Sequence, residues 1–354
     1  MKSYVFQGDR KIAVLDKEKP VPGPGQVLIK TKTSSICGTD LHIYRQPSDS
    51  VSSKGTTVSG HEPVGEVESV GAGVVWPTPG ERVVGYHVAG CNVCKFCQLR
   101  RYKECPHNYS APASDPQRVA MQENLNGSNA EYILLDVGLV LPLPEDFTYA
   151  EGSVLVCNFG TAYGAVRNAF TFPGGTLAVW GLGPVGLNTI LVAKAMGMRI
   201  IGVDVSEGRR AVAASMGVEV VDGAEQGLTE IIHGLTGGEG PDAIIDTTGV
   251  GSVHDLLVPT VKRGGTIVLV GLGHATSVGP VPQAILRQVT IKGSWIFDIA
   301  DWQPMLQFAR EHELVDLMAT VDKIVPIEQF EQAFDEADQA LAGKIIFDWS
   351  STTS

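Results

Sequence analysis

Apolar and polar residues alternate in short runs over the first 150 residues, a pattern typical of strands that are buried on one face. Glycine and proline separate these runs, and such spacing favours a partly open barrel or a sandwich. The clearest runs predict strands at residues 26–33, 65–70, 82–86 and 132–135. The polar, serine-rich segment 46–59 predicts a loop.

Between about residues 176 and 296 the pattern changes, because apolar runs of strand length alternate with longer helical segments. This alternation predicts a parallel sheet with helices on both faces. The stretch from Trp302 to Trp349 predicts one or two helices and a strand that returns to the first domain. The strands predicted in these two regions are 177–180, 200–203, 219–221, 243–246, 266–270, 289–293 and 344–348, and two of the helices are 184–196 and 207–216.

Length and charge narrow the class of protein. A chain of 354 residues predicts about two domains, and 44% hydrophobic with 19% charged residues is usual for a soluble globular protein. A net charge of -12 argues against a nucleic-acid partner. No apolar run reaches membrane-spanning length, and the N-terminus lacks the apolar core of a signal peptide. We therefore expect no membrane contact and a cytoplasmic location, where six cysteines stay reduced.

Four of the six cysteines are spaced C-x2-C-x2-C-x7-C, namely Cys91, Cys94, Cys97 and Cys105. A short loop with this spacing can surround one ion, and tetrahedral zinc takes four soft ligands. Disulfides would need an oxidising compartment, and iron–sulfur proteins use a different spacing. Four cysteines leave no coordination position open, so we predict a structural zinc.

The segment Gly181-Leu182-Gly183-Pro184-Val185-Gly186 directly follows the predicted strand 177–180 and opens a helix. In this setting Gly181 permits a tight turn, Gly183 lets a pyrophosphate approach the backbone, and Gly186 lets the helix pack closely on the sheet. Pro184 and Val185 then begin the helix, where a missing proline N–H costs little. The motif predicts a dinucleotide site.

Asp204, at the end of the next predicted strand, indicates which dinucleotide binds. An acid there accepts both ribose hydroxyls of adenosine and repels the extra phosphate of NADP, so we predict NAD. Arg209 and Arg210 could contact the same ribose, which leaves an opening for NADP. Further expected cofactor contacts are Thr247 and Val270.

Cys37, His61 and Cys157 could form a second metal site, because three protein ligands leave one position for water or substrate. Each has an ordinary alternative, since a buried cysteine usually acts as a small hydrophobe and a lone histidine is usually structural. Spacing cannot join residues 120 positions apart. On the residues alone this site stays open.

Six motifs occur in an order and spacing that resemble those of the zinc-dependent medium-chain alcohol dehydrogenases, over nearly the whole chain. They are CGTDLH, GHEPVGEV, the four-cysteine lobe, CNFGTAYGAV, GLGPVG and GKIIFDW. The resemblance implies an α/β fold with a catalytic domain on a partly open, GroES-like β-barrel and an inserted Rossmann domain. The implied boundaries are 1–156, with the zinc lobe at about 88–108, then 157–298, and a C-terminal return at 299–354.

The resemblance also implies roles for the residues of the second metal site. Cys37, His61 and Cys157 match the ligands of a catalytic zinc, so two zinc ions per chain are expected. Glu62 matches an acid that coordinates the metal transiently, and Asp40 matches a carboxylate that orients the ligand histidine.

A proton relay and a substrate pocket follow from the same resemblance. Thr39 matches the hydroxyl that bonds the substrate oxygen, and His42 matches the group that passes the proton to water after the cofactor ribose. Lys344 stands where some relatives place a pyrophosphate-binding arginine. His87 matches a pocket position, with a surface histidine as the alternative; Tyr44, Phe159 and Trp295 are weaker pocket candidates.

The expected function is therefore an NAD-dependent zinc oxidoreductase that converts a primary or secondary alcohol to an aldehyde or ketone. A polyol or threonine-type dehydrogenase is the nearest alternative: Cys157 favours the alcohol branch, whereas the ending Gly343-Lys344 resembles the polyol branch. A zinc-free enone reductase and a non-enzymatic zinc or dinucleotide protein are further alternatives. The resemblance implies a homodimer or homotetramer that pairs near residues 291–297.

Overall fold

The structure is a computed structural model that describes residues 1–50, 58–107, 127–169, 172–313, 315–339 and 343–351. The chain forms two compact units. The first unit holds Met1–Cys157, Asp298–Trp302 and Val321–Ser354, and the second holds Asn158–Phe297 and Gln303–Thr320. The C-terminal return expected at 299–354 is thus divided between the two units. Most of the predicted loop 46–59 lies outside the described residues.

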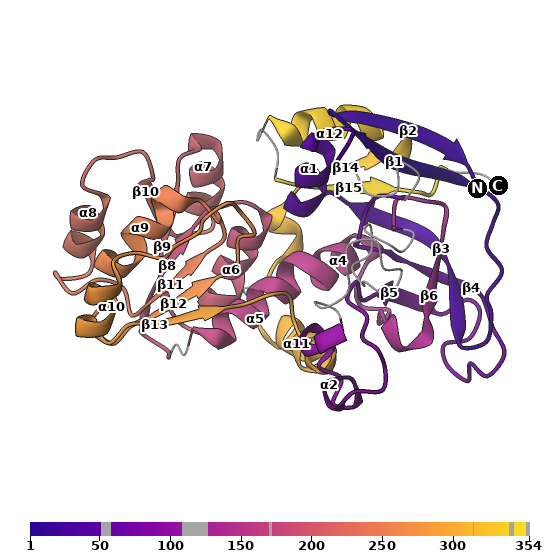
Figure 1. The fold of residues 1–354 in the computed structure, drawn as a ribbon, viewed down its shortest axis with the longest axis horizontal. Helices are drawn as coiled ribbons and strands as arrows, with labels where there is room; N and C mark the ends of the chain where they lie inside the picture. Colours follow the sequence, from indigo (N-terminus) through magenta and orange to yellow (C-terminus); the bar gives the residue numbers. More distant parts are fainter. Residues whose placement is uncertain (51–57, 108–126, 170–171, 314, 340–342, 352–354) are drawn as a thin grey trace. The chain divides into compact units, whose positions relative to one another are not determined.

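The first unit is built on a curved sheet whose described strands run in the order β14-β15-β3-β4-β5-β7, with β6 also paired to β3 and a separate hairpin β1-β2 (Figure 1). Neighbours are antiparallel except β14 and β15. The strands are β1 Lys2–Gly8, β2 Lys11–Asp16, β3 Gln26–Ser35, β4 Val64–Val70, β5 Arg82–Gly85, β6 Tyr132–Asp136, β7 Val140–Pro142, β14 Val321–Pro326 and β15 Lys344–Asp348. The helices are α1 Gly38–Arg45, α2 Lys95–Gln98, α4 Tyr149–Val154 and α12 Phe330–Asp338, with short 3-10 turns at Tyr102–Glu104, Val137–Leu139, Ile299–Asp301 and Ile327–Gln329.

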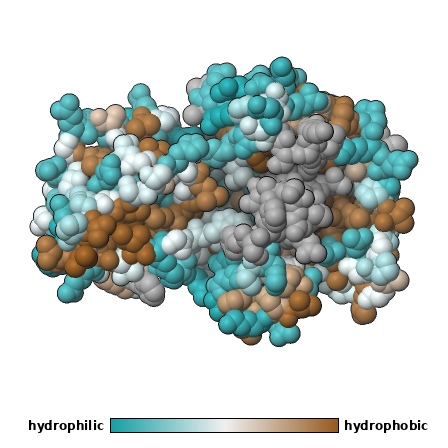
Figure 2. Space-filling view, in the orientation of Figure 1, coloured by the Kyte–Doolittle hydropathy of each residue, from teal (hydrophilic) through white to brown (hydrophobic). Residues whose placement is uncertain are grey.

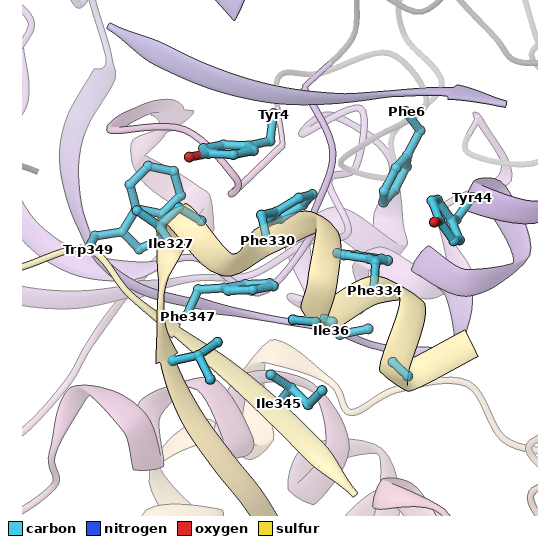
Figure 3. Close-up of a cluster of buried hydrophobic side chains, with 13 residues drawn as sticks. Tyr4, Phe6, Ile36, Tyr44, Ile327, Phe330, Phe334, Ile345, Phe347 and Trp349 are labelled. Atoms are coloured by element: carbon cyan, nitrogen blue, oxygen red, sulfur yellow. The ribbon is translucent and has the colours of Figure 1, made fainter. Parts of the chain in front are cut away.

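A buried aromatic cluster joins the two ends of the chain within this unit (Figure 3). Phe330 of α12 packs 4.6 Å from the ring of Tyr4 in β1 and 4.7 Å from that of Phe347 in β15. Phe334 adds contacts to Phe6 of β1 at 5.1 Å. Because β15 also pairs with β3, the last strand completes the first domain.

Four strands of this unit were not predicted, namely β1, β2, β7 and β14. The β1–β2 turn places Asp9 and Arg10 in the left-handed region, at φ 51° and 58°, without the Asn-Gly or Asp-Gly pair that usually marks such a turn. The strand β7 has only three residues. Several residues of β14 are exposed, so its sequence has only a weak apolar pattern.

The second unit is a parallel sheet with the order β10-β9-β8-β11-β12-β13, which confirms the predicted Rossmann domain (Figure 1). The order reverses between β8 and β11, and dinucleotides bind at the carboxyl ends of strands at such a point. The strands are β8 Thr176–Trp180, β9 Arg199–Asp204, β10 Glu219–Asp222, β11 Ala243–Asp246, β12 Thr266–Leu269 and β13 Thr290–Gly293. The helices are α5 Gly160–Asn168, α6 Pro184–Ala195, α7 Glu207–Ser215, α8 Leu228–Leu235, α9 Gly251–Thr260, α10 Val281–Arg287 and α11 Trp302–Glu311, with a 3-10 turn at Leu317–Thr320.

Residues 303–320 join the second unit because their side chains pack on its helices. The ring of Phe308 in α11 meets Tyr163 of α5 edge-on at 5.5 Å. Asn188 of α6 donates a buried hydrogen bond of 3.1 Å to the hydroxyl of Thr320. Within the described part of the chain, every helix is too short or too polar to span a lipid bilayer.

Candidate active site

Cys37, His61 and Cys157 come together in the first unit, although they lie far apart in the sequence. Their ligand atoms and one carboxylate oxygen of Glu62 all lie within 4.8 Å of one another. The sulfur atoms of Cys37 and Cys157 are 3.8 Å apart, and Cys157 Sγ lies 3.7 Å from His61 Nε2. The fold therefore assembles the trio that the sequence could not connect.

Three different local structures present these side chains. Cys37 precedes the first turn of α1, where the Asp40 carboxylate accepts a hydrogen bond of 2.7 Å from the Cys37 N–H. His61 follows Gly60, whose φ of +86° favours glycine and whose Cβ would lie 2.4 Å from the hydroxyl of Ser128. Cys157 lies in a π-helical turn, Leu155–Phe159, a widened turn that is common at functional sites.

The trio fits zinc. With Zn–S near 2.3 Å and Zn–N near 2.05 Å, a tetrahedral ion separates its ligands by about 3.8 Å for two sulfurs and about 3.6 Å for sulfur and nitrogen. The measured separations of 3.8 and 3.7 Å match these values. Three ligands leave one coordination position, so this site could hold a catalytic metal.

Asp40 lies behind His61, where it can orient the ring. Its Oδ1 is 3.4 Å from His61 Nδ1, which leaves Nε2 directed at the two sulfurs. Burial lowers the pKa of His61, but Asp40 and the Cys37 thiolate raise it more, and the net pKa is well above its usual value. Ligand histidines commonly have such a carboxylate partner.

Glu62 and Lys344 form a fully buried ion pair beside the trio. Glu62 Oε2 accepts hydrogen bonds from the Lys344 ammonium and from the hydroxyl of Ser35. The other oxygen, Oε1, has no hydrogen-bond partner among the described residues and lies 4.0 Å from His61 Nε2. Glu62 is thus held through one oxygen while the other faces the metal site.

Lys344 has a contact that the resemblance did not imply, and the pyrophosphate contact expected of it stays a prediction. Its side chain is completely buried, and Nζ also lies 3.5 Å from the carbonyl of Ile36. Burial lowers the pKa of Lys344, whereas Glu62 and the nearby thiolates raise it more, so the group stays charged. Through its ion pair with Glu62, Lys344 therefore forms part of the surroundings of the metal site.

His87 is buried against the same site. Its ring meets that of His61 edge-on at 5.1 Å, and its Nδ1 has no hydrogen-bond partner among the described residues. Burial and the neighbouring His61 lower the pKa of His87 to about 3, so the ring is neutral at pH 7. The alternative of a surface histidine does not fit this position.

The four-cysteine lobe also fits zinc. Three measured sulfur separations, between 3.5 and 3.9 Å, are close to the tetrahedral value of about 3.8 Å and far longer than a disulfide bond. Gly90 permits this packing, because a Cβ there would lie 2.3 Å from Cys97 Sγ. Residue 108, at the end of the predicted lobe, lies outside the described residues.

The sulfurs of the lobe cannot all carry charge without a cation. Hydrogen bonds from the backbone at Val93 and Cys94 lower the pKa of Cys91 to about 6. Burial and the other three thiols raise the pKa of Cys97 to about 12. A zinc ion would remove this conflict, because it stabilises all four thiolates together.

In the second unit the glycine turn has the geometry that a dinucleotide needs. Gly181 has a φ of +88°, and a Cβ at Gly186 would lie 1.9 Å from the carbonyl of Gly181. A Cβ at Gly183 would meet nothing within 4 Å, so the backbone there is open to a ligand. Pro184 begins α6 directly after it. A pyrophosphate could bind at this helix N-terminus.

Asp204 ends β9 next to this turn. Its two carboxylate oxygens accept hydrogen bonds from Leu182 N at 2.7 Å and Ser206 N at 2.8 Å. Arg210 is occupied by the Asp204 carbonyl and by Asp222. Arg209 lies 3.8 Å from the Asp204 carboxylate, and its buried Nε has no hydrogen-bond partner among the described residues.

The remaining candidates divide into exposed and core positions. Thr39 and His42 are exposed on α1, so both can reach a ligand or water. Tyr44 is fully buried in the aromatic cluster and donates to Asp335, and Phe159 is fully buried. Trp295 is half-buried. Tyr44 and Phe159 are therefore residues of the packed core.

Sequence reasoning missed the polar residues that support the His61–Glu62 loop. The hydroxyl of Ser128 accepts from Glu62 N at 3.2 Å, and Ser128 N donates to the carbonyl of Gly60. Asn129 donates to Ser59. Ser35 binds Glu62 directly. Short polar runs of this kind also occur in ordinary turns, so no sequence signal distinguishes them.

Comparisons with known proteins agree with both units. Residues 23–145 match the model of the alcohol dehydrogenase GroES-like domain, and residues 184–311 match that of the zinc-binding dehydrogenases. The chain is 31% identical to an L-threonine 3-dehydrogenase of Idiomarina loihiensis, over 96% of each chain. It is 29% identical to the sorbitol dehydrogenase of Ovis aries, over 97% of this chain and 95% of that one. The solved structure of an alcohol dehydrogenase from Thermus sp. ATN1 superposes with a TM-score of 0.87 at 26% identity, over 98% and 99% of the two chains.

The chain therefore belongs to the zinc-type medium-chain dehydrogenase/reductase family, and it is an oxidoreductase. Zinc and a nicotinamide dinucleotide are the cofactors of this family in general. The relatives above are named for threonine, for sorbitol and for alcohol in general, so the family alone leaves the substrate open.

We expect two zinc ions per chain in metal analysis of the purified protein. Cys37→Ser should lower the content to one and keep the lobe metal, because the two sites share no ligand. Cys97→Ser is the matched variant for the lobe and should lose the other ion together with thermal stability, since structural zinc contributes to folding. A single zinc in the wild type, or an unchanged content in Cys37→Ser, would contradict the two-site interpretation.

Proposed function

We propose that the protein is an NAD-dependent zinc alcohol dehydrogenase that interconverts an alcohol and its aldehyde or ketone. The observation that carries the proposal is the buried set of two sulfurs and one imidazole at tetrahedral spacing with one position open. These three residues would hold zinc, which would supply a Lewis acid that favours loss of the hydroxyl proton, and a bound NAD would supply the acceptor for the hydride.

The protein's own groups would then bind the substrate and move its proton. Thr39, exposed at the start of α1, is suited to accept the proton from the substrate hydroxyl in a hydrogen bond. His42, one turn along the same helix, is exposed and could exchange the proton with water. Asp40, 3.4 Å from His61 Nδ1, would orient the ring of that histidine.

NAD rather than NADP is supported by the carboxylate at the end of β9. A 2′-phosphate would bring negative charge next to Asp204, which is 7% exposed and already bonded to the glycine turn. Arg209 is the feature that opposes this choice, since its Nε could serve a phosphate. Asp204 is the stronger determinant of cofactor choice, because its carboxylate cannot move away from the ribose position without losing two hydrogen bonds to the backbone.

A polyhydric or otherwise polar substrate is the second candidate, and His87 favours it. A buried ring nitrogen without a partner is unfavourable unless a ligand supplies the missing hydrogen bond. A second polar group on the substrate would do so beside His61. The threonine and sorbitol dehydrogenases among the relatives are named for substrates of this kind.

A homo-oligomer is supported by the edge of the second unit. In the described sheet β13 is the last strand, and an edge strand can pair with a second copy. The adjacent helix α10 exposes Val281, Ile285 and Leu286 at 65–72%, and a brown apolar area covers this part of the surface in Figure 2. A second copy of the chain would cover these side chains.

The main test is NADH formation across a panel of simple, aromatic and polyhydric alcohols and threonine. We expect turnover that stops when zinc is removed. A preference for substrates with a second polar group would support the second candidate. His87→Phe should shift the ratio of kcat/KM values towards apolar alcohols by about tenfold, since one hydrogen bond to the substrate is lost. The matched control is His107→Phe at an exposed position. Absence of NADH formation with every alcohol, or full activity without zinc, would contradict the proposal.

Cofactor choice can be tested by Asp204→Gly. We expect a higher KM for NAD and weaker discrimination against NADP, by about tenfold or more in the ratio of kcat/KM values, because the repelling charge is lost. Glu219→Gly, at the exposed start of the neighbouring strand β10 and so at the opposite edge of the sheet, is the control and should leave the ratio unchanged. An unchanged ratio in Asp204→Gly would show that this carboxylate does not select the cofactor.

Oligomerisation can be tested by the double substitution of Ile285 and Leu286 to Asp. Two charges on the apolar face of α10 should shift the protein to monomers in sedimentation equilibrium. Val21→Asp, at an equally exposed apolar position of the first unit, should keep the wild-type mass. A monomeric wild type would rule out this interface.

A further inference from the structure

His254 is a buried histidine of α9 that the proposed function does not use. Its Nε2 lies 2.9 Å from Asp246 Oδ2 at the end of β11, and its Nδ1 lies 3.2 Å from the carbonyl oxygen of Ser277. Both partners are oxygen acceptors, so the ring makes both hydrogen bonds only when each nitrogen carries a hydrogen.

Asp246 connects the two loops that leave the carboxyl ends of β11 and β12. Its carboxylate also accepts from Thr248 N and Gly249 N at 3.0 Å, which forms the turn after β11. Its backbone carbonyl accepts from Val270 N at 2.8 Å and Gly271 N at 3.1 Å, where the chain leaves β12. His254 extends this set of contacts to Ser277, near the far end of the second loop.

The two loops approach each other so closely that only glycine fits between them. A Cβ at Gly271 would lie 2.3 Å from Gly249 N, and one at Gly273 would lie 2.1 Å from Gly249 O. Residues 272–274 and 276–277 are exposed, so few apolar contacts hold the second loop. The hydrogen bond from His254 to Ser277 is therefore an important restraint on this loop.

These loops lie on one side of the point where the strand order reverses. The glycine turn after β8 and Asp204 after β9 lie on the other side and suit the pyrophosphate and the adenosine ribose. A dinucleotide that crosses this point brings its second nucleotide to the ends of β11 and β12. Thr247, directly after β11, connects the loops on the two sides of this point, because its hydroxyl donates to the carbonyls of Trp180 and Gly181 at the end of β8.

We propose that His254 is a positioning residue for the nicotinamide half of the cofactor. Through Asp246 and the carbonyl of Ser277 it holds residues 270–279 in the position that receives this half, while the adenosine half binds independently of it. The inference rests on the proposed use of a nicotinamide dinucleotide.

The test compares NADH with ADP-ribose, which lacks the nicotinamide, on the full-length, zinc-loaded protein. His254→Phe keeps a ring of similar size but makes neither hydrogen bond. We expect its dissociation constant for NADH to rise about three- to tenfold, as loss of hydrogen bonds implies, and that for ADP-ribose to stay within a factor of about two. The KM for NAD should rise likewise, with kcat at saturating NAD and the KM for the alcohol unchanged.

Two further variants separate positioning from general destabilisation. His254→Gln retains an amide that can donate to Asp246, so its NADH affinity should fall between those of the wild type and His254→Phe; it also carries the test if the Phe variant does not fold. His233→Phe, in α8, removes a comparable bond to the carbonyl of Thr260 and should change neither affinity.

The possible outcomes distinguish this inference from the proposed function. Unchanged NADH affinity in both His254 variants, or an equal loss of NADH and ADP-ribose affinity, would overturn the positioning role and leave the dehydrogenase proposal standing. If the wild type binds neither ligand, the proposed function fails and the inference fails with it.

Discussion

The buried ion pair between Glu62 and Lys344 is the interaction on which the metal site depends. Both side chains are fully removed from water, and loss of either partner from such a pair typically costs about 3–5 kcal/mol, because the other charge is left buried. Lys344 opens β15, which pairs with β3 and is covered by the aromatic cluster. The position of Glu62 beside His61 is thus coupled to the strand that closes the barrel.

The second unit repeats one arrangement at the carboxyl edge of its sheet. Strands β9, β10 and β11 each end in an aspartate whose carboxylate accepts a backbone N–H of the turn that follows. Asp204, at the end of β9, also accepts from Leu182 N in the glycine turn after β8. Asp204 holds the glycine turn in this way, and Asp246 holds the turn after β11. Each carboxylate therefore fixes loop backbone where a ligand would bind, which limits the rearrangement that binding requires.

The predictive value of the sequence differed between the two units. The six strands described in the Rossmann sheet were predicted to within one residue at each end. The four central ones, β9, β8, β11 and β12, are continuous apolar runs because they are buried on both faces. The hairpin β1–β2 was missed, because its turn uses Asp9 and Arg10 in left-handed conformations without the usual residues. The resemblance pointed to Cys37, His61 and Cys157 and to Lys344 as a cofactor contact, but it gave no sign of the ion pair that buries Lys344 against Glu62.

By itself, the sequence determined the features that depend on residues close together in the chain. These are the four-cysteine lobe, the glycine turn with Asp204, and the alternation of strands and helices. Tertiary structure alone decided which distant groups meet: the sulfurs of Cys37 and Cys157, the pair Glu62–Lys344, and the contact of His254 with Asp246 and Ser277. The physical reason is that burial and hydrogen bonding between distant segments depend on the path of the whole chain, which local patterns do not record.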